Sequence, residues 1–135
     1  MAMRLTRQQH GFTDYTYAPL VSIAPEMVGF EKEKTAAALC RMLSSGIFMS
    51  GLTTKAEWGV LKIMPFKTHC ILDIAAGLFA ASAPWIFGFS KNKKARNTFL
   101  AMGAFGILAG ALSQQDDEMI TPDALEQLKS KFNSK

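Results

Sequence analysis

Apolar residues occur in long blocks along this chain, and short charged stretches separate the blocks. A helix on the surface of a soluble protein carries polar or charged residues along one face, about once in every two turns or more often. Residues 98–112 contain no charged residue. In a chain of 135 residues, such a block is more typical of a membrane span than of a buried core helix. The pattern predicts four helices, at about 10–29, 35–53, 68–82 and 98–114.

Charges and prolines mark where these helices are expected to end. Charged residues gather at 31–34 and 91–96, which are predicted to be the turns of two helical hairpins. Pro84 lacks a backbone N–H and is expected to stop the third helix, whereas Pro19 is expected to kink the first. Residues 55–67 are predicted to form a short connector at the membrane interface.

An internal repeat relates the two halves of the chain. Shifted by 59 residues, the segment 10–36 matches 69–95 with nine identities in 27 positions. One inserted residue then aligns Gly46 with Gly106 and extends the match over the second helix of each half. Two parallel two-helix units predict a pseudo-twofold axis along the membrane normal, with both termini on one side.

The predicted fold is all-α, a four-helix transmembrane bundle made of two tandem two-helix repeats. Residues 1–115 are expected to form this four-span domain, with repeat 1 at about 10–53 and repeat 2 at about 69–113.

Residues 116–135 form a polar tail with a predicted helix of its own, at about 122–132. Thr121 is a good N-cap residue, and a proline at the first helical position is already set for helix geometry. The helix is amphipathic and is expected to lie on the membrane or on a partner protein. Its apolar face consists of Ala124, Leu125, Leu128 and Phe132.

The net charge of +4 does not indicate nucleic-acid binding. The basic residues sit in short loops beside apolar segments, as membrane topology requires, and no DNA- or RNA-binding motif accompanies them. The sequence also contains no nucleophile elbow, P-loop, dinucleotide-binding glycine motif or HExxH motif. We therefore expect neither a nucleic-acid partner nor an enzyme.

Two His/Asp pairs are the most informative polar positions. His10 with Asp14 and His69 with Asp73 are each four residues apart, so each pair can form a hydrogen bond on one helix face. One interpretation is structural, with these groups satisfying one another and the free amides of a helix start. The others are a proton- or ion-handling site and, less favoured, a bis-histidine haem site. No Cys or third His completes a zinc set, so no metal is expected.

Further residues have expected roles in the bundle. Arg41 is expected to form an intramembrane ion pair with Glu26, which either holds a hairpin together or has a function of its own. Gly106 and Gly110 form a GxxxG motif for close helix packing, and Gly46 and Ser50 are their aligned counterparts. Four residues are predicted as interface anchors: Trp58, Pro84, Trp85 and Phe89.

The two cysteines are not expected to pair. Cys40 and Cys70 belong near opposite membrane faces, farther apart than a disulfide allows. Two buried thiols outside any disulfide are predicted.

A helix that begins with His69, Leu72 and Asp73 leads to the segment 80–89, read A-A-S-A-P-W-I-F-G-F, and the first half repeats this more weakly. These features resemble the SPW-repeat family of small bacterial membrane proteins. The resemblance implies two units of two transmembrane helices each, in the bacterial inner membrane, and supplies no activity. Repeat 1 departs from the family pattern, because Glu26 stands where the family has Trp.

Two functions remain open from the sequence. The first is a non-catalytic accessory or structural subunit of a larger membrane complex, with the lipid bilayer and other membrane subunits as partners and no cofactor. The alternative is a small proton- or ion-handling or transport protein that uses the His/Asp pairs. A haem-binding subunit is a third, minor interpretation, and a soluble helical bundle is the alternative to the membrane fold.

Overall fold

The residues that the structure describes form five helices, and the fold is all-α as predicted. The computed structural model describes residues 4–113 and 122–134, and these contain isolated bridges but no strand. The helices are α1 (Arg7–Val28), α2 (Lys34–Thr53), α3 (Phe66–Ile86), α4 (Lys93–Leu112) and α5 (Pro122–Asn133).

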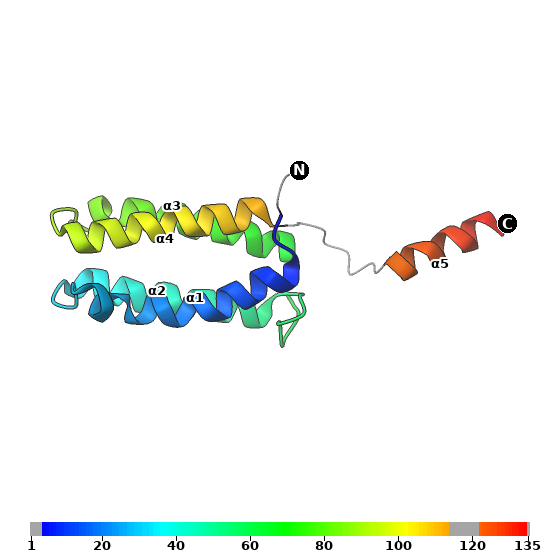
Figure 1. Cartoon of the computed structure of the whole chain (residues 1–135), viewed down its shortest axis with the longest axis horizontal. Coiled ribbons are helices and arrows are strands. Elements are labelled where there is room, and N and C mark those ends of the chain that lie inside the picture. The colour runs from blue at the N-terminus through cyan, green and yellow to red at the C-terminus, as the bar shows by residue number, and fades with distance from the viewer. Residues whose placement is uncertain (1–3, 114–121, 135) are drawn as a thin grey trace.

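The first four helices form two hairpins that lie side by side (Figure 1). Hairpin 1 consists of α1 and α2, and hairpin 2 consists of α3 and α4. Both turns lie at one end of the bundle, and the connector between the hairpins lies at the other end with the start of α1. At that end the Leu5 N–H donates to the Leu112 carbonyl at 2.9 Å, so the beginning and end of the repeat region meet.

The two hairpins match at a constant offset of 59 residues, without the inserted residue that the sequence alignment used. Helices α2 and α4 begin at Lys34 and Lys93, and each is 20 residues long. In this register Gly46 corresponds to Phe105 rather than to Gly106. The sequence alignment followed a chance Gly-Ile match on a helix of small residues, where several registers score alike.

The prolines do not end the first helix of either hairpin, contrary to the prediction for Pro84. Helix α3 continues through Pro84 to Ile86, and α1 continues through both Pro19 and Pro25. The helices are terminated instead by Gly29 and Gly88, which follow their last turns and have left-handed φ values of 91° and 77°. The Phe30 N–H then donates to Pro25 O at 2.8 Å, and the Phe89 N–H donates to Pro84 O at 2.9 Å. Each proline carbonyl thereby anchors the turn that follows.

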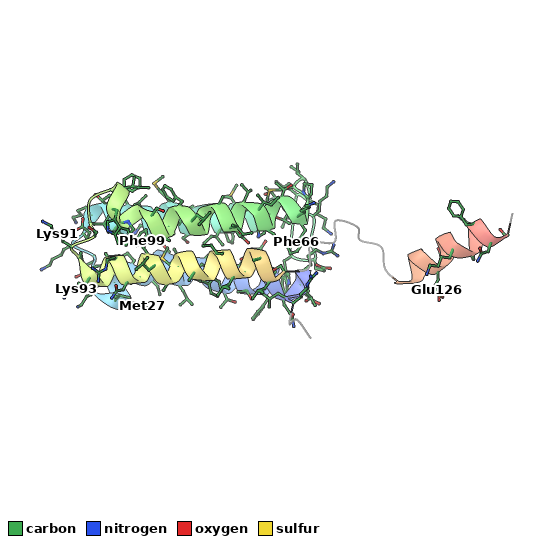
Figure 2. All side chains as sticks on the ribbon, turned by 90° about the horizontal axis from the view of Figure 1, so that it is seen from above. Met27, Phe66, Lys91, Lys93, Phe99 and Glu126 are labelled. Carbon is green, nitrogen blue, oxygen red and sulfur yellow. The ribbon has the colours of Figure 1, made fainter. Side chains whose placement is uncertain are left out.

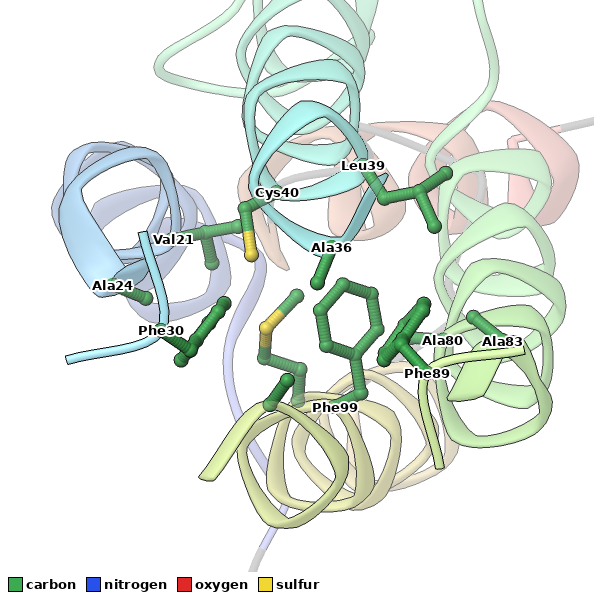
Figure 3. Close-up of a cluster of buried hydrophobic side chains, with 12 residues drawn as sticks. Val21, Ala24, Phe30, Ala36, Leu39, Cys40, Ala80, Ala83, Phe89 and Phe99 are labelled. Carbon is green, nitrogen blue, oxygen red and sulfur yellow. The ribbon is translucent and has the colours of Figure 1, made fainter. Parts of the chain in front are cut away.

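A phenylalanine cluster fills the core near the turns (Figure 3). Phe30 and Phe89 follow the two glycines and are each only 2% exposed, and Phe99 is fully buried between the hairpins. Pro84 is also buried. Pro84 and Phe89 are therefore core residues and not the interface anchors that we predicted, because the turn folds back over the helix ends. Trp58 and Trp85 are exposed.

Many large apolar side chains lie on the outside of the bundle, and several interior positions hold alanine. Ile71, Leu78 and Leu108 are each more than half exposed, whereas Ala83 and Ala95 are fully buried. A soluble protein rarely exposes so much apolar surface. Helices α2, α3 and α4 are each long and apolar enough to cross a membrane. Lys91 and Lys93 mark the turn end of the bundle in Figure 2. The chain is a small membrane protein.

Candidate functional site

The two His/Asp pairs meet in the interior of the bundle. His10 and His69 are the fourth residues of α1 and α3, and Asp14 and Asp73 are the eighth, so the repeat places them at one depth. We call these four residues the quartet. Both imidazoles are at most 2% exposed, and Asp14 is 6% exposed.

The shortest contacts of the quartet cross from one hairpin to the other. His10 Nε2 lies 2.7 Å from Asp73 Oδ2, and His69 Nε2 lies 2.7 Å from Asp14 Oδ2. Within each helix the corresponding N···O distance is 3.3 Å. The sequence spacing indicated the contacts within a helix, but the closer contacts tie the two hairpins together.

Two hydroxyl groups, which the sequence analysis did not single out, hold the other side of each imidazole. Ser113 Oγ lies 2.5 Å from His10 Nδ1, and Thr54 Oγ1 lies 2.7 Å from His69 Nδ1. Both residues follow the last residue of the second helix of a hairpin and are 3% exposed. They are 59 residues apart, so an ungapped repeat alignment reveals them.

The hydrogen-bond directions assign the protons of the quartet. The Thr54 and Ser113 hydroxyls donate to Ser50 O and Ala109 O, so each accepts from the Nδ1–H of its imidazole. A bare Nε2 would place its lone pair against a carboxylate oxygen, so each Nε2 also carries a proton. Two imidazolium groups then face two carboxylates, and the net charge of the quartet is zero. Pairing of this kind is what allows charges to be buried.

An aromatic ring covers the quartet on the side of the connector. Phe66 meets the His10 ring edge-on, with centroids 5.3 Å apart, and it stacks on His69 at 6.0 Å and 12°. The two imidazole rings lie 5.0 Å apart at 79°, and a carboxylate abuts each Nε2. A bis-histidine haem requires the macrocycle between the two rings, so this arrangement does not fit one.

The repeated hairpins agree with the comparison to known families. A family model for the SPW repeat domain matches residues 8–113. The chain belongs to the SPW repeat family. No curated protein and no solved structure matches it.

A cavity of about 490 Å³ adjoins the quartet in this SPW-repeat protein. Asp14 and Asp73 line it at one end, and the rest of its wall comes mainly from apolar residues of α2, α3 and α4. The cavity reflects a departure from the repeat symmetry. Tyr17 of α1 stacks on Phe105 of α4, with ring centroids 4.3 Å apart. The corresponding residues between α3 and α2 are Ala76 and Gly46, which leave that space open.

The other sequence-derived candidates of the SPW-repeat bundle lie apart from the quartet. The guanidinium of Arg41 donates to Glu26, and both side chains are about half exposed on the outside of hairpin 1. Gly106 and Gly110 face the α3 backbone at close range. A Cβ on Gly46, by contrast, would have no neighbour within 4 Å. Gly46 therefore does not serve helix packing, contrary to the prediction. Ser50 lines the cavity.

The cysteines are as the sequence predicted. Cys40 and Cys70 are both buried, and neither is in a disulfide.

Proposed function

We propose that this protein is a multi-pass subunit of the bacterial inner membrane that serves as a non-catalytic accessory component of a larger membrane complex. We further propose that hairpin 1 is the side that contacts the partner subunit. The observation that carries the proposal is a difference between equivalent outer surfaces of the two hairpins.

Hairpin 2 has an outer surface suited to lipid. Trp85 and Leu100 lie on adjacent helices and are 57% and 40% exposed. The same two positions in hairpin 1 hold Glu26 and Arg41, which form a half-exposed ion pair. Charged groups within a membrane helix are costly against hydrocarbon and almost always face protein or water. A partner protein that covers this pair removes the cost.

The composition of helix α1 also favours hairpin 1 as the side that contacts the partner subunit. It has 22 residues, about 33 Å of helix, and so matches the neighbouring spans in length. Its surface is more polar than theirs, because it carries Thr13, Thr16 and Glu26 in addition to the buried quartet residues. Neighbouring helices of another subunit accommodate such groups better than lipid does.

The C-terminal helix offers a second contact. Helix α5 begins at Pro122, as predicted, and Phe132 near its end is 82% exposed. An exposed aromatic residue on a short amphipathic helix favours docking on the membrane surface or on the partner.

The geometry favours this role over transport. A transporter needs an access route on each side of its site in turn. The cavity reaches Asp14 and Asp73 from one side, but the second void, beside His10 and His69, holds only about 10 Å³ among the residues that the structure describes. The quartet therefore suits a closed polar site better than a transport site that releases its ligand on the other side of the membrane.

Purification from native membranes tests the proposal. The tagged protein is extracted in a mild detergent, and the co-purifying proteins are identified by mass spectrometry. We expect stoichiometric larger subunits with the wild type and with the control Leu100→Ala, which changes the lipid-facing side. The double variant Glu26→Trp and Arg41→Leu gives hairpin 1 the surface of hairpin 2 and should reduce recovery of the partner at least tenfold, about 1.4 kcal/mol of binding.

Two results would contradict the accessory role. One is a wild-type protein that purifies alone as a monomer or small oligomer. The other is a double variant that folds, as judged by its elution from size-exclusion chromatography, and still retains the partner at the wild-type level.

A further inference from the structure

We propose that His10, Asp14, His69 and Asp73 form a binding site for one divalent transition-metal ion, with zinc as the best match. This inference does not depend on the accessory role, since it rests only on the interior of the bundle. It also revises the expectation from the sequence that no metal is bound, which rested on the lack of a Cys or third His beside the two His/Asp pairs.

The four donor atoms already converge on one point. One nitrogen or oxygen atom from each residue lies within 4.8 Å of the other three. Zinc bound by histidine nitrogen and carboxylate oxygen prefers a tetrahedron with bonds of about 2.0–2.2 Å, whose edges are then about 3.4 Å. The two N···O edges within the helices are already 3.3 Å. The two crossed edges of 2.7 Å would have to open by about 0.7 Å to reach that value.

The imidazoles are held as metal ligands usually are. A ligating histidine commonly donates its other N–H to a fixed acceptor, which orients the ring and sets the tautomer. Thr54 and Ser113 provide these acceptors, and each hydroxyl is itself directed by its bond to a helix carbonyl. Both Nε2 atoms consequently point at the two carboxylates.

Exchange of two protons for one divalent ion would leave the net charge of this buried site unchanged. One divalent ion would take the place of the two Nε2 protons, which leave to water. The imidazoles become neutral, the carboxylates stay charged, and the net charge of the site remains zero. Two imidazole ligands favour zinc and its neighbours in the first transition row over calcium or magnesium, which prefer oxygen ligands.

The carboxylates are the part of the site that is open to the cavity. Asp14 and Asp73 line the cavity between the hairpins, and the Asp73 side chain is 14% exposed. Among the residues that the structure describes, none donates a hydrogen bond to Oδ1 of either carboxylate. These oxygens are available to capture the ion before it reaches the imidazoles.

Cobalt is the probe for the first experiment, because four-coordinate Co²⁺ has strong visible absorption bands that report its geometry. The full-length protein, purified in detergent and treated with a chelator, is titrated with Co²⁺ and then with Zn²⁺. We expect one Co²⁺ per chain with a four-coordinate spectrum, displacement by Zn²⁺, and a rise in the thermal unfolding temperature with metal concentration. Asp73→Asn should abolish stoichiometric binding, while Glu26→Gln should leave it unchanged.

A milder pair of variants keeps the proposal testable if Asp73→Asn does not fold. Thr54→Val keeps all four ligands but removes the acceptor for His69 Nδ1–H, and should weaken Co²⁺ binding by about 10- to 100-fold. Thr53→Val is its matched control, since within the described part of the chain the Thr53 hydroxyl bonds only to backbone carbonyls of its own helix. The proposal is overturned if folded wild type binds far less than one Co²⁺ per chain. Equal affinities for Thr54→Val, Thr53→Val and wild type would overturn it as well.

Discussion

Hairpins 1 and 2 share one backbone plan but differ in how tightly their helices approach. In hairpin 2 a Cβ on Gly103 would lie 2.6 Å from the carbonyl oxygen of Gly77, so α3 and α4 pack backbone against backbone. The same positions in hairpin 1 hold Ser44 and Ala18, and the Ser44 hydroxyl donates to Ala18 O at 2.6 Å. At this contact hairpin 2 packs backbone against backbone, whereas hairpin 1 adds a hydrogen bond.

The outer surface of hairpin 1 is also more polar than that of hairpin 2. Hairpin 2 presents tryptophan and leucine where hairpin 1 presents the Glu26–Arg41 pair. The buried polar groups do not differ in this way, because each hairpin contributes one histidine and one aspartate to the quartet and one hydroxyl beside it. The comparison teaches that the repeat keeps its buried polar site on both sides, while the surface of hairpin 1 has become more polar.

The largest effect is expected for a substitution at the tightest helix contact. Gly103→Leu places a side chain against the α3 backbone and should destabilise the bundle by about 4 kcal/mol or more. Its control is Gly46→Leu in hairpin 1, where a Cβ meets nothing within 4 Å, and the better helix propensity of leucine should leave stability equal or slightly higher. Thermal unfolding in detergent measures both. Comparable losses in the two variants would show that the hairpins pack alike.

Removal of a carboxylate should have the next largest effect. Asp14→Ala leaves two buried imidazolium groups with a single carboxylate and should cost about 3–5 kcal/mol in metal-free protein. Asp73→Ala is the equivalent change in hairpin 2 and should cost less, because the Asp73 side chain is 14% exposed and that of Asp14 is 8%. The same unfolding measurement ranks the two. A larger loss for Asp73→Ala would contradict the order.

Restoring the repeat symmetry inside the bundle should have a smaller effect. The double variant Gly46→Phe and Ala76→Tyr copies the Tyr17–Phe105 stack into the cavity. Filling a cavity of this kind commonly raises stability by about 1 kcal/mol. It should also slow the uptake of Co²⁺, followed by absorption after rapid mixing. Unchanged uptake would mean that ions reach the quartet by another path.

The smallest effect is expected at the start of α1. The Arg7 guanidinium bonds to both oxygens of Glu57, at 3.0 and 2.7 Å, and these hydrogen bonds hold the pKa of Glu57 below its usual value. The pair therefore adds stability above the usual glutamate pKa, and this contribution disappears as the pH falls through the lowered value. Hairpin 2 has the buried Phe66 in place of Arg7.

Glu57→Gln should cost only about 0.5 kcal/mol at neutral pH, because the Glu57 side chain is 43% exposed. The difference from wild type should vanish in acid. Unfolding temperatures of the two proteins across a pH series provide the measurement. A difference that persists below the glutamate range would assign the effect to something other than this ion pair.

Much of the fold could be predicted because its signals are local. Long apolar blocks, charged turns and the recurrence of His, Asp, Pro, Gly and Phe at one spacing are visible along the chain. The helix ends were harder to predict, since Pro84 lies in the last turn and the left-handed Gly88 terminates the helix. The register of α2 against α4 was wrong by one residue, because small residues recur too often in these helices to define an alignment.

The sequence by itself determined the class of protein, the two-hairpin repeat and the residues that carry charge inside it, because hydropathy and spacing follow directly from residue type. Only the tertiary structure decided that His10 faces Asp73, that Thr54 and Ser113 orient the imidazoles, and that a cavity opens on one side of the bundle. The reason is physical. These features depend on how two hairpins pack across a pseudo-twofold axis, and such contacts join residues that are distant along the chain.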